Sequence, residues 1–145
     1  MPIKIAIGSD HAGLALKEAL KSHLRTLGYG LDDVGTHTAD SMDYPDPAHA
    51  VARIVAAGSA RFGILICGSG NGVSITANRH QGIRCALAWN REIAMLARAH
   101  NDANILALPS RFMVLDEATA CVDAFISGEF EGGRHIKRVE KIEAC

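Results

Sequence analysis

The 145-residue sequence lacks any apolar run that approaches the ~20 residues needed to span a bilayer. It also lacks an excess of charge of either sign. A formal net charge of −1 gives no electrostatic reason to expect nucleic acid or an acidic membrane as a partner. An apolar strand pattern begins within the first residues, so we expect no signal peptide.

Cysteine spacing of the C-x-x-C type is absent, and the four cysteines show no disulfide framework. They are Cys67, Cys85, Cys121 and Cys145. Reduced thiols of this kind are typical of the cytoplasm, which we predict as the location. Histidines of metal-ligand spacing are also lacking, so we predict no metal. The histidines considered for this are His23, His37, His49, His80 and His135.

Three phosphate-binding fingerprints are incomplete. Gly8 and Gly13 have the glycine spacing of a P-loop, but no lysine follows them. The stretch Gly68-Ser-Gly-Asn-Gly-Val73 misses the last glycine of a dinucleotide fingerprint and follows the third predicted strand, not the first. A cysteine phosphatase would need an arginine six residues after Cys67, and position 73 is valine. These three readings are therefore disfavoured.

What the sequence does contain is a regular alternation of strand and helix patterns in a chain of ordinary globular composition. We predict one domain over residues 1–145. The expected strands are Ile3–Ile7, Leu31–Val34, Gly63–Cys67, Ile83–Leu87 and Asn104–Leu108. The expected helices are His11–Leu27, Ala48–Ala57, Val73–Arg79, Asn90–His100 and Leu115–Ile126.

This alternation predicts an α/β fold: a three-layer α/β/α sandwich around a five-stranded parallel sheet, with strand order 2-1-3-4-5 and a Rossmann-like, flavodoxin-like topology. The tail at 131–143 does not fit the alternation. Ligands in such sheets bind outside the strand ends where the strand order reverses, which is between strands one and three.

Cys67 follows the apolar run Ile64–Ile66 and precedes a glycine-rich turn that opens a helix. A thiol at the end of a strand, beside unpaired helix amides, is in a place that favours anions and thiolate, as a catalytic cysteine requires. The alternative is a small buried core residue, as most cysteines are. The glycines at positions 68, 70 and 72 favour catalysis.

The turn after strand one, Gly8-Ser-Asp-His-Ala-Gly13, should face the turn at 67–72 across the crevice. The two turns would bring together Asp10, His11, Cys67 and Ser69. We also expect Asp10 to cap the following helix, and His11 could simply be a surface residue.

Basic residues toward the C-terminus could hold an anion. Arg134 and Arg138 have i, i+4 spacing, so on a helix they would share a face and could grip one phosphate. Their alternative is a solvated basic face. Arg111 follows strand five, close to the same sheet edge. His100 ends the fourth helix, where a solvent-facing histidine is the plain alternative.

Five motifs, spread in order over nearly the whole chain, resemble those of the type B ribose-5-phosphate isomerases. The superfamily also contains the galactose-6-phosphate isomerase subunits. The motifs are Gly8–Gly13, Asp43–Asp46, Ile66–Ile75, His100–Asn104 and Glu131–His135 with Arg138-Val. The resemblance implies an aldose–ketose isomerase of the pentose phosphate pathway that interconverts ribose 5-phosphate and ribulose 5-phosphate through an enediolate, without a cofactor.

The resemblance also implies roles for individual residues. Cys67 matches the base that moves a proton between C1 and C2, and His100 matches the residue that opens the sugar ring. Some members use a glutamate instead, but Ile75 and Thr76 offer no carboxylate. Ser69 is our candidate for relaying a proton to a sugar oxygen. The substrate contacts would be Asp10, His11, Gly68, Gly70, Asn71, Gly72, Asn101, Arg111, Arg134 and Arg138.

Family members are homodimers with shared sites, and a tail that leaves a compact sheet fits such an exchange. We therefore expect Arg111, Arg134 and Arg138 to serve the opposite subunit's Cys67, or at least one side of each site to come from the partner. Whether dimers pair into tetramers stays open. Two other functions stay open as well: isomerisation of a 6-phosphorylated hexose of the allose or galactose type, and a non-catalytic module that binds a phosphorylated sugar.

Overall fold

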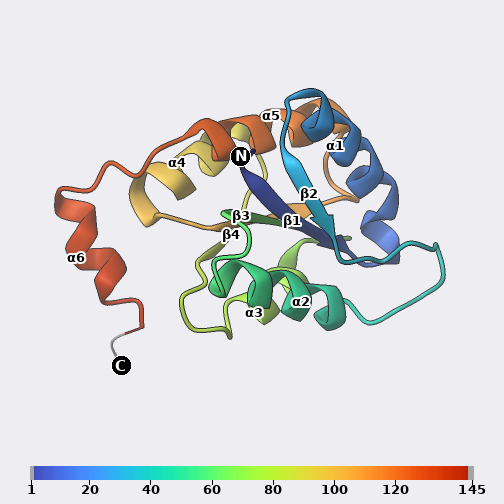
Figure 1. The fold of residues 1–145 in the computed structure, drawn as a ribbon, viewed down its shortest axis with the longest axis horizontal. Coiled ribbons are helices and arrows are strands. Elements are labelled where there is room, and N and C mark those ends of the chain that lie inside the picture. Colours follow the sequence, from blue (N-terminus) through green and yellow to red (C-terminus); the bar gives the residue numbers. More distant parts are fainter. Residues whose placement is uncertain (1, 144–145) are drawn as a thin grey trace.

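The computed structural model describes residues 2–143, which form five strands and six α-helices (Figure 1). The strands are β1 (Lys4–Ser9), β2 (Gly30–Asp33), β3 (Phe62–Cys67), β4 (Cys85–Leu87) and β5 (Ile105–Pro109). The helices are α1 (Leu14–Thr26), α2 (Pro45–Ala56), α3 (Asn71–Ala77), α4 (Arg91–Asn101), α5 (Leu115–Ser127) and α6 (Arg134–Glu140). A short 3-10 turn, His11–Gly13, precedes α1.

All strand pairs are parallel, which confirms the predicted α/β sandwich. The strand order is β2-β1-β3-β5-β4, so the predicted order 2-1-3-4-5 is wrong in its last two positions. The reversal between β1 and β3, which determines where the crevice lies, is as predicted.

The exchange of the last two strands has a physical reason. All five residues of β5 are buried, and a continuous apolar run of this kind is typical of a strand covered on both faces. β4 has only three residues, each of them half-buried, as expected of a short edge strand. The interior position of β5 was therefore visible in the composition of residues 105–109, and the order of strands along the chain was the weaker guide.

Helices cover both faces of the sheet, α1, α4 and α5 on one and α2 and α3 on the other (Figure 1). Alternate side chains of β1 enter two separate cores. Ile5 and Ile7 join the core under α1, α4 and α5, whereas Ala6 joins the core under α2 and α3. This alternation follows from the period of two along a strand. No helix within residues 2–143 is long and apolar enough to cross a membrane.

A buried ion pair fixes the segment that follows β2. The side chain of Lys17 is fully buried, and its Nζ donates to Asp33 Oδ1 at 2.6 Å and to the carbonyl oxygen of Thr36 at 2.7 Å. Lys21 Nζ donates to Asp33 Oδ2 at 2.6 Å. The amide of Ser9 donates to the carbonyl oxygen of Gly35 at 2.7 Å, so the same segment is tied to the end of β1.

α6 contacts α4 and projects from one end of the sandwich, at the left of Figure 1. The tail that did not fit the strand–helix alternation is thus a helix in its own right. It begins at Arg134, after a turn in which Gly132 and Gly133 have φ values of 69° and 54°. Such positive φ values favour glycine, which explains the Gly-Gly pair before the helix.

Candidate active site

Cys67 is the last residue of β3 and lines a pocket of about 590 Å³ at the predicted reversal point. Only 5% of Cys67 is exposed, yet the residue forms part of the pocket wall, so it does not lie in a sealed interior. The residues that line this pocket, here called the thiol pocket, are Asp10, Tyr44, Cys67, Gly68, Ser69, Asn71, Gly72, Ile75, Arg111 and Phe112.

The turn at 68–72 is shaped by Gly70, whose φ of 76° lies in the left-handed region. A Cβ at this position would collide with the side chain of Leu87 and would lie 3.1 Å from the carbonyl carbon of Leu108. Ser69 Oγ accepts a hydrogen bond from the amide of Asn71 at 3.2 Å, which fixes the hydroxyl at the start of α3. The backbone of the turn therefore passes close to β5, with Ser69 facing the pocket.

Asp10 lines the thiol pocket together with Cys67 and Ser69, as predicted. Its Oδ1 accepts a hydrogen bond from the amide of Gly13 at 3.0 Å, which confirms the expected cap. The amide of Asp10 donates to the carbonyl oxygen of Ile66 at 3.2 Å, so the two turns are directly linked. His11 is not among the described residues that line the thiol pocket. Its Nδ1 accepts a hydrogen bond from the amide of Met42 at 3.2 Å.

Arg111 lines the thiol pocket of its own chain, contrary to our expectation that it serves the opposite subunit. Its amide donates to the carbonyl oxygen of Gly68 at 3.0 Å, and this bond holds it beside the glycine turn. A Cβ added to Gly68 would lie 3.2 Å from Arg111 Nη1. A guanidinium therefore lies within the same pocket as Cys67.

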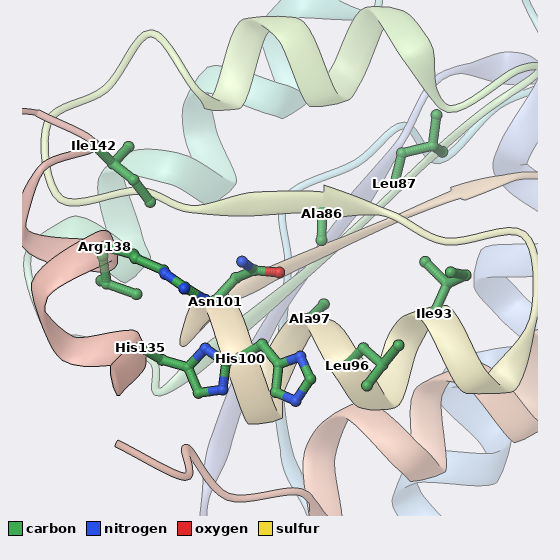
Figure 2. Close-up of a pocket in the computed structure, with 11 residues that line it drawn as sticks. Ala86, Leu87, Ile93, Leu96, Ala97, His100, Asn101, His135, Arg138 and Ile142 are labelled. Atoms are coloured by element: carbon green, nitrogen blue, oxygen red, sulfur yellow. The ribbon is translucent and has the colours of Figure 1, made fainter. Parts of the chain in front are cut away.

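The remaining predicted residues gather elsewhere. His100, Asn101 and Arg138 line a second pocket of about 690 Å³, here called the tail pocket, between α4, β4 and α6 (Figure 2). Arg134 lies on α6 as predicted, but it is exposed and is not among the described residues that line either pocket. Arg134 and Arg138 thus lie on one helix, as predicted, but only Arg138 lines the tail pocket.

A histidine that sequence reasoning did not place at the site, His135, lies against His100 in the tail pocket (Figure 2). The two rings are stacked, with centroids 4.3 Å apart and an angle of 15° between their planes. Burial lowers the pKa of His135, and the neighbouring charges of His100 and Arg134 lower it further. The neutral form of His135 is therefore favoured near neutral pH.

The sequence spacing showed no close histidine pair of metal-ligand type, yet histidines that are far apart in the chain lie together in the fold. Besides the His100–His135 stack, His49 Nδ1 and His80 Nε2 are 2.6 Å apart. His49 lies on α2 and His80 follows α3, so the pairing depends on the packing of two helices. A single sequence gives no indication that two histidines about 30 residues apart are in contact.

Within the described residues, most of the predicted site residues lie in two separate pockets of one chain. The thiol pocket holds Cys67, Ser69, Asn71, Asp10 and Arg111, whereas the tail pocket holds His100, Asn101 and Arg138, and the two have no lining residue in common. The groups expected to act on one substrate are thus divided between two places on the molecule.

Comparison with known proteins gives a consistent result. A model of the family described as Ribose/Galactose Isomerase matches residues 5–142. Ribose-5-phosphate isomerase B of Escherichia coli (strain K12) is 46% identical over 141 residues, which cover 97% of this chain and 95% of that protein.

Solved structures agree. A ribose 5-phosphate isomerase from Thermotoga maritima has a TM-score of 0.97 and 48% identity, over 99% of each chain. Ribose-5-phosphate isomerase B from Mycoplasma genitalium, solved with bound ribulose-5-phosphate, has a TM-score of 0.94 and 44% identity, over 98% of this chain and 95% of that one.

Proposed function

The chain belongs to the ribose/galactose isomerase family, and we infer from this that it is an aldose–ketose isomerase that interconverts ribose 5-phosphate and ribulose 5-phosphate. The observation that carries the inference is the relative from Mycoplasma genitalium, which binds ribulose-5-phosphate on the same fold at 44% identity. We further propose that residues 1–145 act as one domain in the cytoplasm. Cys67, Cys85 and Cys121 are free thiols, which supports that location.

In the mechanism that we propose, Cys67 is the base. Isomerisation removes a weakly acidic proton beside the sugar carbonyl, and it needs a base together with donors for the enediolate oxygens. Cys67 lies in the pocket wall, directly before the amides of the glycine turn. Those amides stabilise the enediolate, and Ser69 passes a proton to a sugar oxygen. Asp10, Asn71 and Arg111 contact the substrate in the same pocket, as do Gly68 and Gly72.

We assign ring opening and phosphate binding to the tail pocket. His100 delivers the proton that releases the ring oxygen, and Asn101 and Arg138 contact the substrate there. Arg134, which lies on the same helix but outside the pocket lining, is a further proposed substrate contact. A phosphate held by guanidinium groups fixes the sugar relative to the base, which turns remote binding energy into orientation. The remaining proposed substrate contacts are His11 and Gly70. Gly70 contributes through the shape that it gives to the turn.

Because these groups lie in two pockets, we propose that a second copy of the chain completes each site. The tail pocket of one copy would then face the thiol pocket of the other. An exposed apolar patch beside the thiol pocket supports this arrangement: Trp89, Phe112 and Val114 are 52%, 60% and 72% exposed. Large exposed apolar groups of this kind mark surfaces that bind another protein.

The family description also covers galactose isomerases, so a 6-phosphorylated hexose is the second candidate substrate. The curated relatives with a specific name favour the pentose. Initial rates over ribose, allose and galactose phosphates decide between the two. Turnover of ribose 5-phosphate at least tenfold above the hexoses supports our assignment, and the reverse ranking contradicts it.

Thiol alkylation separates an isomerase from a module that only binds sugar phosphates. Burial raises the pKa of Cys85 to about 12 and, together with Glu117, that of Cys121 to about 11, so both thiols stay protonated at pH 8. In a Cys145→Ser background, iodoacetamide should therefore label Cys67 first and abolish turnover. Ribose 5-phosphate should protect it. A thiol at position 67 that labels no faster than Cys121 would contradict the role of Cys67.

A further inference from the structure

Three side chains around the tail pocket have the composition of a metal site. His100 Nε2 lies 3.7 Å from Glu131 Oε1, and His135 Nε2 lies 3.9 Å from the same oxygen. One ligand atom of each residue lies within 4.8 Å of those of the other two. Both distances are too long for a hydrogen bond, so the carboxylate is close to two imidazoles without binding either.

The backbone holds these residues in place. The amide of Glu131 donates to the carbonyl oxygen of Ala99 at 2.9 Å, which places the carboxylate beside the last turn of α4. Glu131 and His135 are four residues apart, and the amide of His135 donates to the carbonyl oxygen of Gly132 at 3.0 Å, across the turn that begins α6. The side chain of His135 is only 8% exposed. The turn between α5 and α6 therefore places Glu131 and His135 beside His100 of α4.

The spacing suits a tetrahedral ion. Two ligands at ~2.0–2.2 Å from one zinc ion lie roughly 3.3–3.5 Å apart, so the observed oxygen–nitrogen distances need to shorten by only a few tenths of an ångström. The two imidazole planes are only 15° apart, so their nitrogen lone pairs are nearly parallel and His100 must turn out of the stack to share an ion with His135. Glu131 is 60% exposed and His100 34% exposed, which leaves both side chains room to turn toward a common centre. The buried imidazole of His135 is the fixed member.

We propose that His100, Glu131 and His135 bind one divalent transition-metal ion of the zinc class. Two imidazole nitrogens and one carboxylate are ligands that zinc accepts, whereas magnesium and calcium require mostly oxygen. Three protein ligands leave a fourth position for water. Arg138, which lines the same pocket, and Arg134 repel a cation, so the site binds its metal reversibly.

The metal also has a consequence for catalysis, and this step rests on the function proposed above. Zinc bound to His100 Nε2 occupies the nitrogen that would pass a proton to the ring oxygen. Metal binding and ring opening therefore exclude one another. Zinc is expected to inhibit the reaction of cyclic ribose 5-phosphate through the tail pocket, with no need to contact Cys67.

Calorimetric titration of the metal-free protein with zinc chloride tests the site directly. We expect one zinc ion per chain at this site, with affinity reduced at least tenfold in Glu131→Gln. Glu129→Gln is the matched control, because Glu129 is an exposed carboxylate two residues away and lies outside the cluster. His49→Asn removes the other histidine pair, and Cys67→Ser removes the pocket thiol; neither change should alter this binding step.

Equal zinc affinity in Glu131→Gln and Glu129→Gln, or no binding at all, would overturn the proposal. Inhibition of turnover is measured separately from zinc binding. Zinc should inhibit wild-type turnover, and Glu131→Gln should need at least a tenfold higher zinc concentration for the same inhibition. Zinc binding that depends on Glu131 in a protein that turns over no sugar phosphate would support the metal site and refute the proposed function instead.

Discussion

Cys67 and His100, the two residues to which we assign proton transfer, line two different pockets of the same chain. Cys67 ends β3 at the reversal point of the sheet, whereas His100 lies in the last turn of α4 beside the projecting α6. If both act on one sugar, the partner of each Cys67 is the His100 of a second copy. This arrangement can be tested without a structure of the assembly.

The first prediction is complementation between inactive chains. Cys67→Ala and His100→Asn chains, unfolded together and refolded as a mixture, should recover activity, because one site of each mixed dimer has both residues intact. For equal amounts and random pairing, we expect roughly one quarter of the wild-type rate per chain. The control is the same treatment of each variant alone. A mixture no more active than the sum of its components would mean that each chain supplies both residues to its own site.

The second prediction concerns the base. Cys67→Ala should lower kcat by roughly 10²–10⁴-fold, the usual contribution of a positioned general base, with little change in substrate affinity. Affinity can be measured as the steady-state KM for ribose 5-phosphate, since KM approaches the dissociation constant when the chemical step is slow. Near-wild-type turnover of Cys67→Ala would show that another group removes the proton.

His100→Asn is expected to separate ring opening from proton transfer. The variant should lower kcat for cyclic ribose 5-phosphate more than kcat for ribulose 5-phosphate, which is an open-chain ketose, whereas kcat/KM must fall equally in both directions because the equilibrium constant is unchanged. Initial rates at saturating substrate in both directions provide the measurement. Equal losses of kcat in the two directions would contradict a role in ring opening and would favour a role for His100 in binding alone.

The ion pair between Lys17 and Asp33 predicts a loss of stability in acid. Burial raises the pKa of Asp33, but hydrogen bonds from Lys17, Lys21 and the amide of Gly35 outweigh that effect and lower it to about 2. A carboxyl group with a lowered folded pKa stabilises the fold above its unfolded pKa of 3.8, and this contribution is lost as the pH falls from about 4 toward 2.

Asp33→Asn should therefore lower the free energy of unfolding by about 3–5 kcal/mol at pH 7, because it leaves a buried lysine without its main partner. Its unfolding should also depend less on pH between 4 and 2. Asp32→Asn is the control, since Asp32 forms only a 3.9 Å pair with the exposed Lys4. Urea unfolding at fixed protein concentration measures both. A similar loss in the two variants would refute the special role of Asp33.

Local patterns predicted much of this structure, and contacts between distant segments account for the errors. The strand ending at Cys67 and the glycine turn were readable, because an apolar run and punctuating glycines are local signals. The family resemblance was also correct, and it is confirmed by the match over residues 5–142. The order of β5 and β4 was predicted wrongly. Both strands follow helices, and only their burial distinguishes the interior strand from the edge strand.

The composition of the site shows the same limit. Asp10, Cys67 and Ser69 come together because they lie at or just after the ends of adjacent parallel strands, which the predicted topology already implied. The stacking of His135 on His100 depends on how α6 returns to α4, and no local pattern encodes that contact. The contact of Arg111 with the thiol pocket of its own chain was not predicted, because its bond to Gly68 joins the ends of β3 and β5, which the predicted strand order did not make neighbours.

The last prediction tests the shape of the glycine turn. Gly70 and Gly82 both have positive φ, 76° and 81°, so alanine at either position meets a backbone penalty of about 1–2 kcal/mol. A Cβ at Gly82 has nothing within 4 Å, whereas one at Gly70 collides with Leu87 and approaches Leu108. Gly70→Ala must therefore displace the turn that carries the proposed enediolate donors.

We expect Gly70→Ala to lose at least tenfold in kcat and to unfold at a lower urea concentration than Gly82→Ala. The Gly82→Ala control should keep wild-type turnover. Equal activity in the two variants would mean that the 68–72 amides do not need this geometry.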